Sequence, residues 1–357
     1  MFSGTKAALS IFTRRSLGGV LFNQTDHGVQ LARLGNLNEK PLVVDAFAEL
    51  PAPVDDRAIA EWIATNFPHR GSGYLASYCG FHPVDRLLLR ETINTRRFAE
   101  PNYLATLLAE TAKLPSLTNW HVAALSATNG DFLDAATASQ AGLLFGMPQS
   151  TVREFQARLL KLHLRPRRID AGTLPLLGAL TRHIRETAYP HAIVVCEIAH
   201  TQTHAYFLAK DGVHTRATFP HGLLSIVEAA MKELAAPDIA TARQHLEEPT
   251  EDLRAHSRRL VRSITHHLKP AVDYFEMQTG QSINACFCAH LPARLSWLEE
   301  ALCAAINLEF LAPDIAAWIP STGLQLAEGT PVPGRSWFQP LSLVANLAPL
   351  PANEPRT

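Results

Sequence analysis

Apolar residues recur along the chain with the period of a β-strand in some segments and the period of an α-helix in others. Residues 28–34 and 41–47 alternate apolar and polar side chains, which predicts two neighbouring strands joined as a hairpin. Residues 55–67 begin with two acids and then carry apolar side chains at helical spacing, so a helix is predicted after the hairpin. Further predicted helices are 101–113, 150–162, 174–184 and 295–306, and further predicted strands are 73–78, 121–126 and 283–288.

A second pattern of a strand hairpin followed by a helix begins near residue 192. Residues 192–197 form a nearly continuous apolar run, which predicts a buried strand. Residues 204–209 and 213–219 predict a hairpin, because the tight turn Lys210-Asp211-Gly212 joins them. Residues 224–234 predict the helix that follows. The repeated hairpin-and-helix opening indicates that a second lobe starts here.

Four stretches have a less regular pattern. Residues 131–145 fit either a helix or a strand, and residues 235–250 are polar and contain two prolines. Residues 250–279 predict one long helix that is disturbed at Pro270. The chain from residue 320 onward is rich in proline, and we expect its end to be disordered.

Composition narrows the class of protein. The chain has 357 residues, 47% of them apolar, which is enough for two core-bearing lobes or for one large α/β unit with insertions. Lysine and arginine number 32 against 33 acids, so no excess charge indicates a nucleic-acid or membrane-surface partner. Five scattered cysteines argue against a disulfide framework and favour the cytoplasm. Residues 1–21 contain no apolar run long enough for a signal peptide or a membrane span.

The common catalytic and metal motifs are not found in the sequence. It contains no Gly-x-Ser-x-Gly, Walker loop, Rossmann glycine set or His-Glu-x-x-His, so hydrolase, P-loop and zincin functions have no support. His200 and His204 would lie about 13 Å apart on a strand, too far for one zinc ion. Cys286 and Cys288 lack a second cysteine pair and are interpreted as buried apolar residues, and His266-His267 as a solvated patch. We therefore expect no metal site.

Four segments occur in the order found in a known family. Residues 21–34 (LFNQTDHGVQLARL) stand where that family has its first phosphate loop, and residues 193–223 contain a second such hairpin followed by an arginine. Residues 158–180 are similar to a segment of that family that contains a helix, a strand ending in aspartate and an apolar helix. Residues 258–311 are similar to a long helix and an adenosine-motif strand and helix. Over most of residues 17–348 the chain resembles PilM, the type IV pilus assembly family of the actin-like ATPase superfamily.

The resemblance implies a fold class and a division into domains. The fold would be α/β, an actin-like (ribonuclease H-like) duplicated two-lobed fold with a small α+β subdomain inserted in the first lobe. The predicted parts are a flexible tail 1–16, a first lobe 17–190 with the insertion at about 88–165, a second lobe 191–348 and a disordered tail 349–357.

The first phosphate loop departs from the family pattern. Intact loops have an acid and then a glycine, because the acid helps hold Mg²⁺ and the backbone must pass close to the phosphates. Here Asn23 takes the place of the acid and Thr25 that of the glycine. In an active ATPase, Asp26 would have to substitute for the missing aspartate. We expect weakened metal binding.

The other two nucleotide motifs depart as well. The second hairpin has Glu197, Ala199 and Thr201 where an acid, a glycine and a small hydroxyl residue are expected. Alanine instead of glycine is a modest change if φ is negative and a costly one if φ is positive. The adenosine motif has Ala289 and His290 in place of adjacent glycines, and His290 is large enough to fill the purine pocket. All three changes together indicate lost binding.

The resemblance implies a function with two rivals. The predicted function is a cytoplasmic scaffold, peripheral at the inner membrane, in the platform of a type IV pilus or related secretion system. It would bind the cytoplasmic tail of a bitopic pilus-alignment protein and other platform components, without a cofactor and without nucleic acid, and could form a homo-oligomer. The rivals are an active Mg–ATP-binding ATPase and an actin-like filament or cell-division scaffold. Leu87-Leu88-Leu89, Phe98 and Tyr103 either offer a docking groove or pack in the core.

Overall fold

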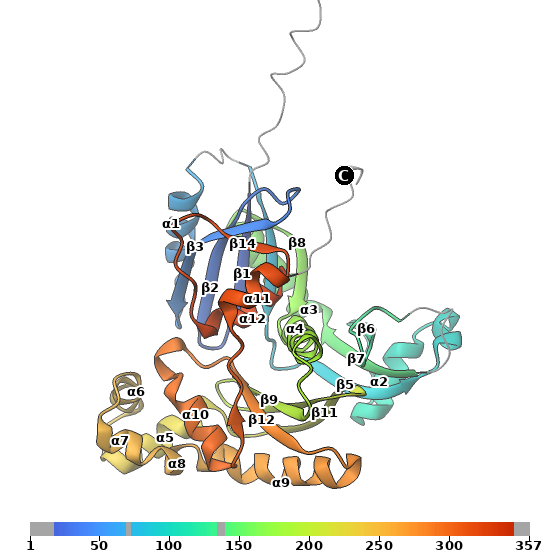
Figure 1. Ribbon diagram of the computed structural model, residues 1–357. Helices are drawn as coiled ribbons and strands as arrows, with labels where there is room; N and C mark the ends of the chain where they lie inside the picture. Colours follow the sequence, from blue (N-terminus) through green and yellow to red (C-terminus); the bar gives the residue numbers. More distant parts are fainter. Residues whose placement is uncertain (1–17, 69–72, 134–139, 346–357) are drawn as a thin grey trace, which may run out of the picture.

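The computed structural model describes residues 18–68, 73–133 and 140–345. These residues form three sheets, of which the two larger ones lie one above the other with helix α4 between them (Figure 1). The predicted tails 1–16 and 349–357 lie outside the described residues. Within the described ranges, no helix has both the length and the apolar character needed to cross a membrane.

The first large sheet has six strands in the order β14-β3-β2-β1-β4-β8. Strand β1 is central and buries both faces, because Phe22 packs with helices α1 and α3 while Leu21 packs with α4. Strands β1, β2 and β3 are antiparallel, and β1, β4 and β8 are parallel. The elements of this lobe are β1 Gly19–Thr25, β2 Gly28–Leu34, β3 Leu42–Pro51, α1 Asp56–Asn66, β4 Leu75–Phe81, α3 Gln149–Lys161, β8 Leu164–Ala171, α4 Thr173–Glu186 and β14 Leu324–Leu326.

The second large sheet repeats this pattern. Its order is β11-β10-β9-β12-β13, and β9 takes the place of β1, with all seven of its residues buried. Val194 faces the core between this sheet and the helices α5 and α10. Val195 faces the opposite way, into the core shared with α4. The elements of this lobe are β9 Ala192–Ile198, β10 Thr203–Ala209, β11 Gly212–Phe219, α5 Leu223–Leu234, β12 Ile283–Ala289, α10 Trp297–Ala305 and β13 Glu309–Phe310. The predicted hairpin at 210–212 is confirmed.

The third sheet is small and lies beside the two lobes (Figure 1). It comprises β5 Leu87–Ile93, β7 Gln140–Pro148 and β6 Trp120–Ser126, and it is covered by α2 Tyr103–Ala112. Phe98 and Tyr103 pack into its core, as do Leu87 and Leu89 at its margin. The backbone N–H of Arg90 donates to Thr215 Oγ1 at 2.9 Å, so strand β5 is attached to the edge strand β11 of the second lobe.

One predicted helix is wrong, and one helix was not predicted. Residues 250–279 form α7 Glu251–Ala255, α8 Ser257–Leu260 and α9 Arg262–Thr279, and Pro270 lies inside α9. The breaks fall at His256 and Val261, where ψ is 5° and 1° instead of a helical value of about −42°, and the apolar spacing continues across both. The polar segment 235–250 contains a helix that the prediction lacked, α6 Ile239–Glu247, which is capped by the Asp238 side chain.

The chain after residue 310 returns to the first lobe. It contributes α11 Ile315–Ser321, strand β14 and α12 Phe338–Ser342. Phe338 and Leu341 of α12 are fully buried in the core between the two large sheets. This segment therefore positions Gln339 at the junction of the lobes.

Candidate functional site

The turns of the two hairpins meet where the lobes face each other. The backbone N–H of His200, in the β9–β10 turn, donates to Asp26 Oδ2 at 3.1 Å. The ring nitrogen Nε2 of His27, in the β1–β2 turn, lies 3.2 Å from the carbonyl oxygen of Ile198. The two segments that resemble phosphate loops are therefore in direct contact with each other.

Glu197 lies at the centre of a buried polar network below these turns. Its side chain is fully buried at the end of β9, and it accepts hydrogen bonds from the Arg86 guanidinium and the Thr173 hydroxyl. Burial is the largest single effect and would raise the pKa of Glu197, but Arg86, His290 and His82 together outweigh it and hold this pKa well below its ordinary range. Glu197 is therefore ionised, and its counter-ion is a side chain of the protein.

Two histidines face the same carboxylate. The Nδ1 atoms of His82 and His290 lie 3.6 Å and 3.8 Å from Glu197 Oε1. Burial lowers the pKa of both histidines, so both rings are neutral. Gln339 Nε2 lies 2.9 Å from His82 Nε2 and 2.7 Å from His290 Nε2. An amide NH₂ that donates to both Nε2 atoms leaves both Nδ1–H groups directed at Glu197.

Local backbone geometry brings the two rings together. His290 has a positive φ of 74°, a left-handed conformation that glycine adopts more easily, at the position where the resemblance expects a glycine. At Gly172, the residue before α4, an added Cβ would lie 2.4 Å from His82 Nε2, so only glycine leaves room for this ring. The imidazoles meet edge to face, with ring centroids 3.9 Å apart.

The first hairpin supplies no charge to this network. Asn23 is fully buried, and its Nδ2 donates to Gln30 Oε1 at 3.2 Å. Its Oδ1 has no hydrogen-bond partner among the described residues. Thr25 Oγ1 accepts from the backbone N–H of His27 at 3.2 Å and so closes the turn. Neither residue adds a carboxylate beside Glu197.

The second hairpin tolerates its alanine. Ala199 is not among the residues with a positive φ, so the change from glycine is the modest one of the two alternatives. Its N–H donates to the carbonyl of Gln202 at 2.9 Å, and its carbonyl accepts from Leu223. Gly222 is required beside it, because an added Cβ would lie 2.3 Å from the Ala199 carbonyl oxygen. Thr201 is exposed at the tip of the turn.

A cleft of about 550 Å³ opens above the network. Of the residues chosen from the sequence, Thr25, Ala289 and His290 line it, and Gln339, Arg243 and Arg294 form other parts of its wall. His290 lines this cleft with its side chain buried against Glu197 and His82, and its role in filling a purine pocket stays a prediction.

Sequence reasoning missed several members of the network. His82 and Arg86 lie in the connection between β4 and β5, Thr173 begins α4, and Gln339 lies on α12. Each is a single polar residue without a spacing pattern, and the four come together only because the strands end at the same edge of the lobes. No motif in the sequence could have identified them.

Comparison with known proteins identifies the fold. No protein-family model matches the chain, and no curated protein matches it either. A solved PilM–PilN type IV pilus biogenesis complex matches with 15% identity over 92% of this chain and 98% of that chain, at a TM-score of 0.68. A Bacteroides thetaiotaomicron protein with an actin-like ATPase fold matches at 10% identity over 84% and 92% of the two chains, with a TM-score of 0.43. The cytoplasmic domain of EpsL from the Vibrio cholerae type II secretion system matches at 9% identity over 92% and 94%, with a TM-score of 0.42.

The match to PilM spans nearly the whole of both chains. It confirms the structural resemblance that the order of segments indicates, and the fold is the actin-like fold.

Proposed function

We propose that the protein is a PilM-like scaffold in the inner-membrane platform of a type IV pilus or a related secretion system, and that it does not hydrolyse ATP. The observation that carries this proposal is the match to PilM over 92% of the chain. The proposed location is the cytoplasmic face of the inner membrane. The predicted first lobe 17–190, with an insertion at about 88–165, and the predicted start of the second lobe at 191 are part of the proposal. The predicted end of the second lobe at 348 is not, because β14 pairs with β3 of the first lobe.

The proposed partner is the cytoplasmic tail of a bitopic inner-membrane protein. The similar structure is a complex of PilM with PilN, which supports a protein partner of this kind. Other platform components and further copies of the chain are proposed as additional partners. A nucleic-acid partner is not proposed, because the charges of the chain balance.

The residues at the junction of the lobes do not fit Mg–ATP. Mg²⁺ is a hard cation that prefers carboxylate oxygens, and the buried carboxylate Glu197 is already neutralised by Arg86. Asn23 adds no negative charge, and Asp26 is engaged by the backbone of His200. These contacts support a scaffold without ATPase activity, and no catalytic step is assigned to the site.

One observation favours the rival, an active Mg–ATP-binding ATPase. The cleft of about 550 Å³ has the volume of a small-molecule site, and the basic residues Arg243 and Arg294 lie on its wall.

A filament or cell-division scaffold is the third possibility. It predicts self-assembly, which analytical ultracentrifugation measures directly.

A thermal-shift titration with Mg–ATP and with ADP tests the nucleotide question. A ligand that binds only the folded state raises stability by about 2.7 kcal/mol at a hundred times its Kd, which shifts Tm by several degrees. We expect no shift at millimolar nucleotide. A clear shift that disappears in Arg294→Ala would place a nucleotide in the cleft and overturn the proposal.

A peptide-binding measurement tests the partner. Fluorescence anisotropy would use the labelled cytoplasmic tail of a bitopic membrane protein encoded beside this gene. Phe132 is 79% exposed next to the third sheet, and Met277 is 76% exposed on α9 of the second lobe. If the tail binds at the inserted sheet, Phe132→Ala weakens binding and the matched control Met277→Ala does not. Equal affinities in both variants would locate the tail elsewhere.

A further inference from the structure

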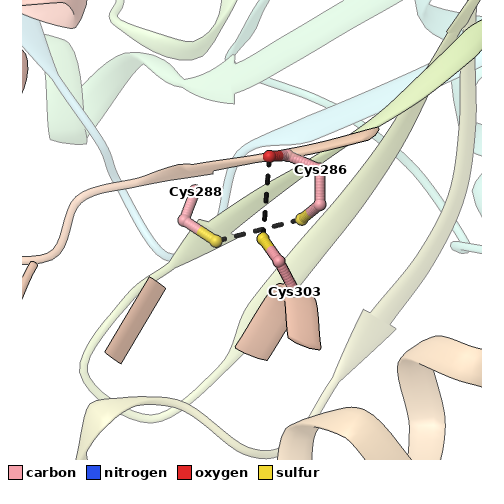
Figure 2. Close-up of side chains that lie close together, drawn as sticks. All are labelled: Cys286, Cys288 and Cys303. Atoms are coloured by element: carbon pink, nitrogen blue, oxygen red, sulfur yellow. Dashed lines mark hydrogen bonds between the residues drawn. The ribbon is translucent and has the colours of Figure 1, made fainter. Parts of the chain in front are cut away.

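Four of the five cysteines of the chain lie together in the core of the second lobe. Cys196 comes from β9, Cys286 and Cys288 from β12, and Cys303 from α10. All four are at most 3% exposed. Figure 2 shows the sulfur atoms of Cys286, Cys288 and Cys303 directed toward one another across the space between the strand and the helix.

Strand register and helix packing explain this convergence. Cys286 and Cys288 are two residues apart on one strand, so their side chains leave the same face. In the parallel pairing of β12 with β9, Cys196 lies directly beside Cys288. Helix α10 covers this face, and Cys303 reaches the Cys286 carbonyl oxygen at 3.7 Å. The sulfurs of Cys196 and Cys303 therefore lie beside the Cys286–Cys288 pair, which the sequence spacing of that pair could not predict.

The distances between the sulfurs fit a tetrahedral metal site. Cys286 Sγ lies 3.7 Å from Cys196 Sγ and 3.9 Å from Cys288 Sγ. The sulfurs of Cys286, Cys288 and Cys303 all lie within 4.8 Å of one another, and Cys196 does not belong to this mutually close set. A zinc ion with Zn–S bonds of about 2.3 Å requires sulfurs about 3.8 Å apart. Two sulfurs in van der Waals contact have a similar separation, so one distance alone does not indicate a metal site. The observation that favours metal binding is that several sulfurs gather at the same place.

We propose that this cysteine cluster binds one thiophilic metal ion of the Zn²⁺ class through Cys286, Cys288 and Cys303, and that the Cys196 side chain, whose sulfur lies beside that of Cys286, turns toward the other two to complete the site. The proposal goes beyond the scaffold function and does not depend on it. Zinc in structural sites is bound by three or four thiolates. The ion would join β9, β12 and α10, three elements that are far apart in the sequence.

One arginine fixes the strand that carries two of the cysteines. The Arg335 guanidinium donates to the Cys288 carbonyl oxygen at 3.3 Å, and its side chain is only 20% exposed. Arg335 also pairs with Glu299, so its charge is balanced by that carboxylate and its contact with the cluster is through the backbone of β12.

Without metal the same residues form an apolar core. All four cysteines belong to the buried apolar core of the second lobe. Metal binding must then displace protons, and because the site is closed by the core, the ion must enter during folding. The two states differ in metal content, which can be measured.

The experiment uses the full chain, purified without chelators under reducing conditions. Native mass spectrometry and elemental analysis are expected to find one metal ion per chain, released on unfolding in the presence of a chelating dye. After refolding with Co²⁺, the protein is expected to show thiolate-to-Co²⁺ charge-transfer absorption and the visible bands of tetrahedral Co²⁺. Since the wild-type chain gives this signature by itself, the test does not depend on any variant folding.

Variants then assign the ligands. Cys286→Ala and Cys303→Ala are expected to lose the bound metal, and Cys79→Ala is expected to keep it. Cys79 is the matched control, because it is 1% exposed in the core of the first lobe, with Ser77 as its hydrogen-bond partner. The proposal is overturned if wild-type chain that has refolded with Zn²⁺ or Co²⁺ holds no ion, or if Cys79→Ala loses metal as completely as the other two variants.

Discussion

The two hairpin turns occupy equivalent places in the two lobes, yet they depart from a phosphate-binding pattern in opposite ways. In the first hairpin the acid is replaced by Asn23, so the charge is gone. In the second hairpin Glu197 keeps the charge, but Arg86 of the other lobe neutralises it. Under the proposal that this site does not bind Mg²⁺, one turn lacks the acid and the other holds its acid in an internal ion pair. The loss of that buried ion pair is costly.

The largest expected effect comes from breaking that ion pair. Arg86→Met leaves Glu197 buried without its counter-ion, and we expect the free energy of unfolding to fall by about 3–5 kcal/mol. Both side chains are at most 3% exposed, so solvent cannot replace the partner. Urea denaturation measures the change. The double variant Arg86→Met/Glu197→Gln should recover a large part of it, and a loss below about 1 kcal/mol in the single variant would contradict the assignment.

The next effect is a loss of stability in acid that depends on the second hairpin. Burial lowers the pKa of His204 on β10 from 6.5 to about 4. A depressed pKa gives stability that is complete above the unfolded value, so we expect it to be lost as pH falls from about 6.5 to about 4. The linked free energy is on the order of 3 kcal/mol.

Denaturation curves at several pH values test this expectation. His204→Gln should flatten the decline, while His200→Gln should not, because His200 is exposed in the turn that precedes β10. A wild-type chain whose stability is constant between these pH values would show that burial does not hold His204 neutral.

A smaller effect follows from restoring the acid of the first hairpin. Asn23→Asp introduces a carboxylate at a fully buried position without a cation beside it, and we expect a loss of about 1–3 kcal/mol. Asn38→Asp, at an exposed position in the β2–β3 connection, is the control and should change stability by less than about 0.5 kcal/mol. A gain of Mg²⁺ affinity in Asn23→Asp, measured by calorimetry, would show that Arg86 does not block the site.

The smallest effect is expected from restoring the glycine of the second hairpin. Ala199→Gly should lower stability by at most about 1 kcal/mol, because alanine already fits the backbone there. It should leave the thermal response to Mg–ATP unchanged. If this variant alone acquired a nucleotide-dependent shift, the alanine and not the ion pair would be what separates the two turns in function.

The sequence predicted the elements better than it predicted their interruptions. The hairpin at 210–212 and the buried strand at 192–197 were predictable, because turn residues and apolar runs are local signals. The breaks in 250–279 were not, since Leu253, Leu260 and Ile264 keep a continuous helical stripe across both breaks. Periodicity indicates which face is buried, and it does not indicate a single residue whose ψ is about 0° between two helical turns.

For the site, the sequence indicated the place but only part of the chemistry. The positions chosen by resemblance lie on the turns and strand ends at the junction of the lobes, and their assignment to a nucleotide site stays a prediction. The partners of Glu197 were not predictable, because Arg86 and Gln339 come from connections whose position depends on the whole fold. The same limit applies to the cysteine cluster, where strand pairing and not spacing brings Cys196 to Cys286.

The direct hydrogen bonds between the two turns have a consequence for timing. In a protein whose lobes close around a nucleotide, the rate of hydrolysis determines how long a partner stays bound. Here Asp26 and His27 of one turn already bind the other turn, with distances of 3.1 Å and 3.2 Å. A platform built on such a protein would keep its subunit in one shape, and the signal to assemble or to disassemble would have to come from another component.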